Sequence, residues 1–251
     1  MTRIAIIGGS GLTELANLEI THRRIVRTPY GEPSGPLTFG HIGASEVVFL
    51  ARHGAGHRLA PHEINYRANL WALHHLEVQR VIAVCTVGGI AANLGAGAVA
   101  LPDQIIDYTW GRPSTYFEGS EQPVTHIDFT HPYDEGVRAI LRAAAKRAGV
   151  AVVDGGTYAA TQGPRLETKA EIDRLEGDGA TMVGMTGMPE AALARELGLA
   201  YAALAVVVNP AAGRGASAHS VSLEDIGRVM EQAMEKVRLV VAAAVQSHAG
   251  A

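Results

Sequence analysis

The stretch VQRVIAVCTVGG, from Val78 to Gly89, decides the fold. Up to Thr86 it is a run of mostly β-branched and small apolar residues, and glycines end it, so it predicts a buried strand. Similar apolar runs on both sides of it in the chain predict further strands at Arg3–Ile7, Glu46–Arg52, Asp103–Asp107 and Ala200–Asn209.

Segments with helical periodicity separate these strands, at Ile64–Leu76, Tyr133–Ala148, Thr168–Glu176, Pro189–Leu197 and Ser222–His248. Pro189 suits the head of a helix, where its missing N–H costs nothing, and Ser222 can cap another helix. Gly149 and Gly198 follow helices as C-terminal stops. The alternation predicts an α/β fold: a single domain over residues 1–251, with a central mixed β-sheet flanked by helices.

Composition excludes several classes of protein. The chain has 251 residues, 47% of them hydrophobic, a net charge of −4 and a single cysteine. We therefore expect neither disorder nor a nucleic-acid partner, and the absence of a long apolar run predicts no membrane span. The start of the chain reads as a strand and its turn rather than a signal peptide. Cys85 has no partner for an intrachain disulfide, which suits a cytoplasmic protein, and we expect it in the core.

Hydroxyl, basic and glycine residues follow several predicted strands. Ser10 lies in a GGSG turn, Arg52 and His53 follow the strand that begins at Glu46, and Thr86 precedes two glycines. Thr186 lies in MTGMPE at the start of a helix, where free N–H groups can bind an anion. Each feature alone is explained by a turn or a cap. Because strand ends converge at one edge of an α/β sheet, the set together favours an oxyanion site.

Two further polar residues and one long loop stand out. Glu167 follows GPRL, and Asn209 ends an apolar run. A carboxylate and an amide can read the edge of a planar heterocycle, but a helix cap and a turn before Pro210 explain them equally well. The loop-rich segment Gly111–Pro132 is long for a compact domain and is expected to be functional or to contact a neighbour.

Longer blocks identify a family. They are GGSGL, ARHGAGHRLAPHEINYRANLWAL, TVGG, DQIIDYTWGRPSTYF, GPRLET and VGMTGMPEAALARELGL. From Ile4 to about Asn209, the chain resembles the purine nucleoside phosphorylase and methylthioadenosine phosphorylase family. The resemblance implies a homotrimer with a mixed sheet, which uses inorganic phosphate as a co-substrate and needs no metal or organic cofactor.

The resemblance also implies roles for individual residues. The phosphate site would consist of Ser10, Arg52, His53, Thr86, Thr186 and the Val87 backbone. Met185 would lie against the ribose, and Leu166 would face the base. His126 would reach across the trimer interface into the 5′ pocket of a neighbouring subunit, which would account for the long loop.

The base-reading positions resemble those of 6-oxopurine enzymes. Asn209 matches an asparagine whose amide donates to O6 and binds N7, and Glu167 matches a glutamate that accepts from N1–H. Neutral adenine has no N1–H, and such polar mismatches are strongly disfavoured. Animal-type methylthioadenosine phosphorylases carry aspartates where this chain has Asn209-Pro210-Ala211. Some archaeal methylthioadenosine enzymes share a motif similar to GPRLET, so Glu167 alone does not decide the base.

The 5′ end depends on one position. Ordinary purine nucleoside phosphorylases place a histidine at the start of the last long helix. The matching position in this chain is Leu223, and a small shift of the alignment would place His219 there instead. An apolar side chain suits a methylthio group and gives a hydroxyl no partner. The favoured nucleoside is S-methyl-5′-thioinosine, and the segments NYRANLWAL and VVNPAAG are most similar to bacterial phosphorylases of that nucleoside.

The expected enzyme is a pentosyltransferase that yields hypoxanthine and 5-methylthioribose 1-phosphate, with Asn209, Glu167 and His53 as its catalytic residues. The alternatives are a methylthioadenosine phosphorylase or a general 6-oxopurine nucleoside phosphorylase. From other classes, a histidine-type phosphatase built on His53 and a non-catalytic nucleotide-binding module also remain.

Overall fold

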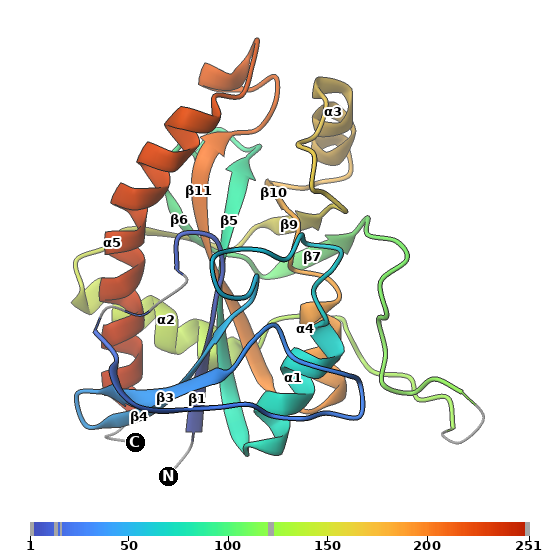
Figure 1. Cartoon of the computed structure of the whole chain (residues 1–251). Coiled ribbons are helices and arrows are strands. Elements are labelled where there is room, and N and C mark those ends of the chain that lie inside the picture. Colours follow the sequence, from blue (N-terminus) through green and yellow to red (C-terminus); the bar gives the residue numbers. More distant parts are fainter. Residues whose placement is uncertain (1–2, 13–14, 16, 120–122, 249–251) are drawn as a thin grey trace.

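The computed structural model describes residues 3–12, 15, 17–119 and 123–248, and the strands of this part form one mixed sheet (Figure 1). Its centre is parallel and consists of β4 (Ser45–Ala51), β1 (Arg3–Gly8), β5 (Val78–Gly89) and β11 (Ala200–Pro210), adjacent in that order. These four strands agree with the sequence prediction to within a few residues.

The flanking strands make the sheet mixed. Beyond β4 lie the antiparallel strands β3 (Leu37–Ile42) and β2 (Glu19–Arg24). On the far side of β11, β6 (Val99–Leu101) runs antiparallel and carries the parallel strand β8 (Val152–Asp154). At the end of β5, three short strands continue the sheet: β10 (Met182–Gly184), β9 (Thr157–Ala160) and β7 (Gln104–Asp107).

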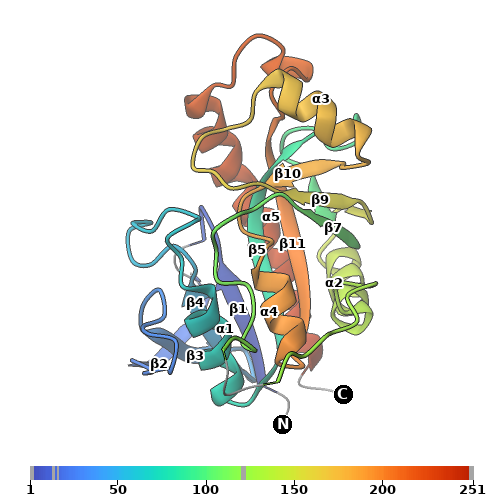
Figure 2. The same ribbon diagram turned by 90° about the vertical axis from the view of Figure 1, so that its right-hand side faces the viewer.

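Helices cover both faces of the sheet (Figures 1 and 2). The helices α2 (Glu135–Arg147) and α5 (Leu223–His248) share one core with alternate residues of β5 such as Ile82. The helices α1 (Tyr66–His75) and α4 (Glu190–Glu196) share a second core with the intervening residues, such as Val81. A smaller cluster packs α3 (Lys169–Gly177) onto β9 and β10. The predicted α/β class with helices on both faces is confirmed.

The helix boundaries follow local signals. The Ser222 hydroxyl accepts a hydrogen bond from the Asp225 N–H at 3.2 Å, so Ser222 caps α5 as predicted. Gly149 and Gly198 end α2 and α4 with φ of 67° and 68°, the left-handed conformation that favours glycine. Pro189 occupies the N-cap of α4, and the helix begins one residue later than the sequence suggested.

Strand β5 changes its neighbour along one edge. The parallel pairing with β1 ends at Ile7 and Ala83, and the antiparallel pairing with β10 begins at Gly88. Between these points, residues 84–87 face no described strand on that edge, while β11 pairs with them along the other. This interruption leaves room beside the middle of the sheet.

The described part of the chain contains no helix that is both long and apolar enough to cross a membrane. The segment from Gly111 to Pro132 forms no helix or strand in its described residues, as predicted, while residues 120–122 lie outside the description.

Candidate active site

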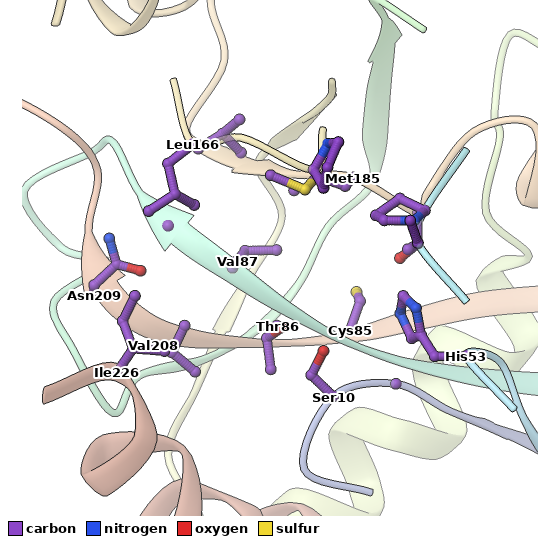
Figure 3. A pocket seen from close by; sticks show the side chains of 18 of the residues that line it. Ser10, His53, Cys85, Thr86, Val87, Leu166, Met185, Val208, Asn209 and Ile226 are labelled. Carbon is purple, nitrogen blue, oxygen red and sulfur yellow. The ribbon is translucent and has the colours of Figure 1, made fainter. Parts of the chain in front are cut away.

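A cavity of about 550 Å³ lies beside the interrupted edge of β5 (Figure 3). Its volume is in the range typical of small-molecule sites. Its lining includes every site residue predicted from the sequence except His126: Ser10, Arg52, His53, Thr86, Val87, Leu166, Glu167, Met185, Thr186, Asn209 and Leu223. In Figure 3, Ser10, His53 and Cys85 gather at one end, whereas Leu166 and Asn209 lie toward the other. The strand ends thus bring together residues from the whole length of the chain.

Arg52 is held by a carboxylate that the sequence did not reveal. Its Nε donates to Glu190 Oε2 at 2.7 Å, and its Nη2 donates to Glu190 Oε1 at 2.8 Å. Both side chains are buried, and Tyr201 also donates to Glu190 Oε1 at 2.9 Å. Burial acts to lower the pKa of Arg52, but the Glu190 carboxylate raises it by more, so Arg52 stays charged. Its charge is matched inside the protein.

Arg52 takes the place of a strand partner at the interrupted edge of β5 with its remaining guanidinium nitrogen. Its Nη1 donates to the carbonyl of Val84, at 2.8 Å, where β5 has lost its β1 neighbour. The adjoining turn has no room for a side chain, because a Cβ on Gly9 would lie 2.6 Å from Val84 O and 2.8 Å from Arg52 Nη1. The backbone of the GGSG turn therefore lies close to the guanidinium at Gly9, the residue before Ser10.

His53 lies beside this pair and is fixed by its own loop. Its Nδ1 is 2.8 Å from the carbonyl oxygen of Leu59, and its ring stacks on His57 at a centroid distance of 4.1 Å. Burial is the main cause that lowers the pKa of His53 to about 4, and the Arg52 cation and His57 lower it further. The Leu59 hydrogen bond opposes this shift without reversing it. His53 is therefore neutral near pH 7.

The opposite end of the cavity carries the carboxylate and the amide. Glu167 Oε1 accepts a hydrogen bond from the Thr161 hydroxyl at 2.7 Å, which leaves Oε2 free for a ligand. Asn209 Nδ2 donates to the carbonyl of Pro210 at 2.6 Å, which leaves the second amide hydrogen and Oδ1 free for a ligand. The structural alternatives are wrong, because Thr168 rather than Glu167 caps α3, and Asn209 lies within β11 rather than in a turn. Both residues line the cavity.

A buried arginine ties together two loops that line this cavity. Arg112 Nη1 donates to the carbonyls of Met185 and Met188, and Nη2 donates to the carbonyls of Thr161 and Gln162. The first loop carries Thr186, and the second leads to Glu167. Arg112 belongs to the segment Gly111–Pro132 that was predicted to be functional. The first residues of that segment therefore hold two loops of the cavity in place.

The remaining wall is apolar. Val221, Leu223 and Ile226, at the start of α5, line the cavity, and His219 is exposed and absent from the described lining. His126 is also exposed and is absent from the described lining, so a role in a neighbouring subunit stays a prediction. Cys85 is buried, as expected, and burial raises the pKa of its thiol to about 12.

Sequence reasoning missed the residues that position others. Glu190 and Arg112 contact site residues from distant segments, Thr161 donates to Glu167 six residues later, and His57 stacks on His53. Only the loop prediction at Gly111–Pro132 pointed to one of them. In the described part of the chain, no group of three or more histidine, cysteine, aspartate or glutamate side chains is arranged to hold a metal ion.

Comparison with known proteins identifies the class. Residues 3–246 match the Phosphorylase superfamily, and the chain belongs to this family. Its fold is that of a methylthioadenosine phosphorylase from Schistosoma mansoni in complex with adenine, with a TM-score of 0.95 and 30% identity. That comparison covers 100% of this chain and 93% of the other. The chain is an enzyme of the nucleoside phosphorylase type, a pentosyltransferase, as expected.

Two of the most similar relatives are a probable phosphorylase of S-methyl-5′-thioinosine and a phosphorylase of 6-oxopurine nucleosides. The chain is 52% identical to the probable S-methyl-5′-thioinosine phosphorylase of Pseudomonas syringae pv. tomato, over 96% of this chain and 98% of that protein. It is 44% identical to the 6-oxopurine nucleoside phosphorylase of Pyrococcus furiosus, over 98% of this chain and 92% of that one. The family resemblance found in the sequence is confirmed.

Proposed function

We propose that this chain catalyses the phosphorolysis of S-methyl-5′-thioinosine to hypoxanthine and 5-methylthioribose 1-phosphate. The observation that carries the proposal is one cavity that combines a Glu167–Asn209 pair, an anion-binding end and an apolar wall around Leu223. The relatives that are more than half identical and named as probable phosphorylases of this nucleoside support the same substrate.

Phosphate would occupy the end formed by the strand termini. Ser10, Thr86 and Thr186 offer hydroxyls there, and Arg52 keeps N–H groups beyond the three that it gives to Glu190 and Val84. An anion fixed under C1′ stabilises the oxocarbenium character of the ribose as the C1′–N9 bond breaks. One phosphate oxygen then bonds to C1′. Overall, one proton enters on hydrogenphosphate and leaves on the free base.

The base would lie between Glu167 and Asn209. The free Glu167 oxygen can accept from N1–H of a 6-oxopurine, and Thr161 keeps the carboxylate in place. The remaining Asn209 hydrogen can donate to O6, and its Oδ1 can accept from a protonated N7 as negative charge develops on the leaving base. Asn209 therefore assists departure, and Glu167 selects the base.

The apolar wall favours a methylthio group at the 5′ position. Val221, Leu223 and Ile226 offer no hydrogen-bond partner from their side chains to a 5′-hydroxyl, so inosine loses a hydrogen bond there. Inosine is nevertheless the second candidate, because the chain is similar to a 6-oxopurine nucleoside phosphorylase over almost its whole length. Membership of the Phosphorylase superfamily argues against a histidine-type phosphatase.

The test is a comparison of substrates. The protein is incubated with phosphate and, separately, S-methyl-5′-thioinosine, 5′-methylthioadenosine, inosine or adenosine, and the release of free base is followed. We expect the highest kcat/KM for S-methyl-5′-thioinosine and no release without phosphate. A higher kcat/KM for 5′-methylthioadenosine than for S-methyl-5′-thioinosine would contradict the roles of Glu167 and Asn209. Equal kcat/KM values for inosine and S-methyl-5′-thioinosine would contradict the role of Leu223.

The homotrimer and the cytoplasmic location remain predictions from the sequence. The exposed His126 is consistent with a residue that serves a neighbouring subunit. Light scattering of the purified protein at several concentrations tests the trimer directly.

A further inference from the structure

His53 combines two features that together decide how it can bind an anion. It is 6% exposed, and its Nδ1 is 2.8 Å from the carbonyl oxygen of Leu59. A carbonyl oxygen can only accept, so Nδ1 must carry the hydrogen of that bond. In a neutral imidazole the other nitrogen, Nε2, then has no hydrogen and acts as an acceptor.

The surroundings of the ring disfavour a second proton. Arg52 precedes His53 in the chain, and His57 stacks on the ring. Glu190 on α4 is committed to Arg52, and the Cys85 thiol from β5 stays protonated because burial raises its pKa to about 12. Arg58, the other charged residue of the loop that lines the cavity, is exposed and adds positive charge rather than negative.

Nε2 is left for the ligand. It makes no hydrogen bond to any described residue, although His53 is more than nine-tenths buried and lines the cavity. Figure 3 shows the ring at the same end of the cavity as Ser10, the end assigned to phosphate. An acceptor that faces an oxyanion is repelled by lone pairs unless the anion itself supplies a hydrogen.

We propose that His53 accepts a hydrogen bond from the O–H of bound hydrogenphosphate, and that the site thereby selects a protonated phosphate over dianions that carry no hydrogen. The inference rests on the proposed function, because it places phosphate at this end of the cavity. His53 is then a specificity residue for the co-substrate. The Arg52–Glu190 pair fits this assignment, because it supplies donors to the anion while its own charges cancel.

The affinities of three anions distinguish this hydrogen bond from simple charge attraction. At a pH where most phosphate is hydrogenphosphate, sulfate and monofluorophosphate also carry two negative charges and have a similar size, but neither has a hydrogen to donate. We expect both to bind at least about tenfold more weakly than phosphate, because each would leave Nε2 unpaired against an oxygen or fluorine. Isothermal titration without nucleoside measures the three dissociation constants.

Nitrogen NMR tests the tautomer in the unmodified protein. With 15N-labelled histidine, the two-bond couplings between ring carbons' hydrogens and nitrogens identify which nitrogen of His53 carries the hydrogen, and a His53→Gln variant assigns the signals. We expect a protonated Nδ1 and a bare Nε2 near pH 7, and a shift of the Nε2 signal on addition of phosphate but not of sulfate. A hydrogen on Nε2 in the free protein overturns the proposal.

Two variants complete the test. In His53→Gln the amide can turn its NH2 group toward the anion, so the preference for phosphate over sulfate should fall by about tenfold. Ser10→Ala is the matched control: its hydroxyl donates to either anion, so its loss should weaken both and leave their ratio unchanged. An unchanged ratio in His53→Gln contradicts the proposal.

The outcomes also separate this inference from the proposed function. If the protein binds phosphate selectively but does not cleave nucleosides, the proposed function fails and the role of His53 stands. If it cleaves nucleosides with phosphate but binds sulfate and monofluorophosphate equally well, the function stands and the role of His53 fails.

Discussion

Arg52 and Glu190 are 138 residues apart in the chain, yet their side chains form a two-pronged buried ion pair at the edge of the cavity. Breaking a buried pair by removing one partner is costly, whereas replacing both by apolar residues is often neutral or stabilising. The pair is therefore better explained by the proposed role of Arg52 as a donor to phosphate than by stability.

We expect Glu190→Gln to lower the free energy of unfolding by about 3 kcal/mol, because it leaves the Arg52 charge buried without a counterion. Tyr201→Phe, which removes only one hydrogen bond to Glu190, should cost about 1 kcal/mol. The double variant Arg52→Met with Glu190→Leu should regain most of the stability but not the use of phosphate. Urea unfolding and phosphate KM are the measurements. An active double variant would show that Arg52 does not bind phosphate.

Arg112→Lys should reduce kcat/KM for the nucleoside by about tenfold or more, because an ammonium cannot reach the carbonyls of both loops and small displacements of positioning groups are costly. Steady-state kinetics with saturating phosphate measures this change. Arg228→Lys, on the exposed side of α5, is the control and should be unaffected. Equal kinetics of the Arg112 and Arg228 variants would mean that Arg112 does not position the cavity.

Asn209→Asp should shift the preference from S-methyl-5′-thioinosine toward 5′-methylthioadenosine, because a carboxylate accepts from a 6-amino group where the amide donates to O6. The ratio of the two kcat/KM values is the measurement. A general loss of activity with an unchanged ratio would contradict the base-reading role of Asn209.

Leu223→Ser should reduce the preference for S-methyl-5′-thioinosine over inosine by about tenfold, because a methylthio group loses apolar contact and a 5′-hydroxyl gains a partner. Leu239→Ser changes another exposed leucine of α5 that lies away from this cavity, so it should leave the ratio unchanged. If both variants leave it unchanged, Leu223 does not contact the 5′ group.

Stability should fall as the pH drops from about 6.5 to about 4, the range between the ordinary and the lowered pKa of His53. In that range the unfolded chain binds a proton that the folded protein does not, so acid favours unfolding, by up to about 3 kcal/mol from this residue. Urea unfolding at several pH values should show a flatter dependence for His53→Gln. The exposed His62 provides the control variant His62→Gln, which should keep the original slope.

The sequence predicted the parts of the fold whose signals are local. The apolar run at β5 and the capped helix at Ser222 were found within a few residues. The strand Glu19–Arg24 was missed because every one of its residues is exposed, so burial leaves no alternating pattern. The strand Met182–Gly184 was missed because three residues carry too little pattern.

The same distinction holds for the site. Ser10, Thr86 and Asn209 line the cavity and belong to a glycine turn or to strand ends, which can be recognised along the chain. The contacts of Glu190 with Arg52, and of Arg112 with the Met185 carbonyl, join segments far apart in the sequence and depend on the three-dimensional arrangement of the sheet. Stacking of His57 on His53 also left no signal, because it requires the tight turn of that loop.

The interruption along β5 divides the cavity into a part that depends on backbone pairing and a part that depends on individual side chains. The space for the proposed phosphate end lies where β1 stops and β10 has not yet begun, so the backbone pairing creates this space, and a change of one side chain leaves the pairing in place. The walls that we propose for the base and the 5′ group consist of side chains such as Asn209 and Leu223, which a point mutation can replace. Descendants of such a protein can therefore acquire new nucleosides while they keep the same co-substrate.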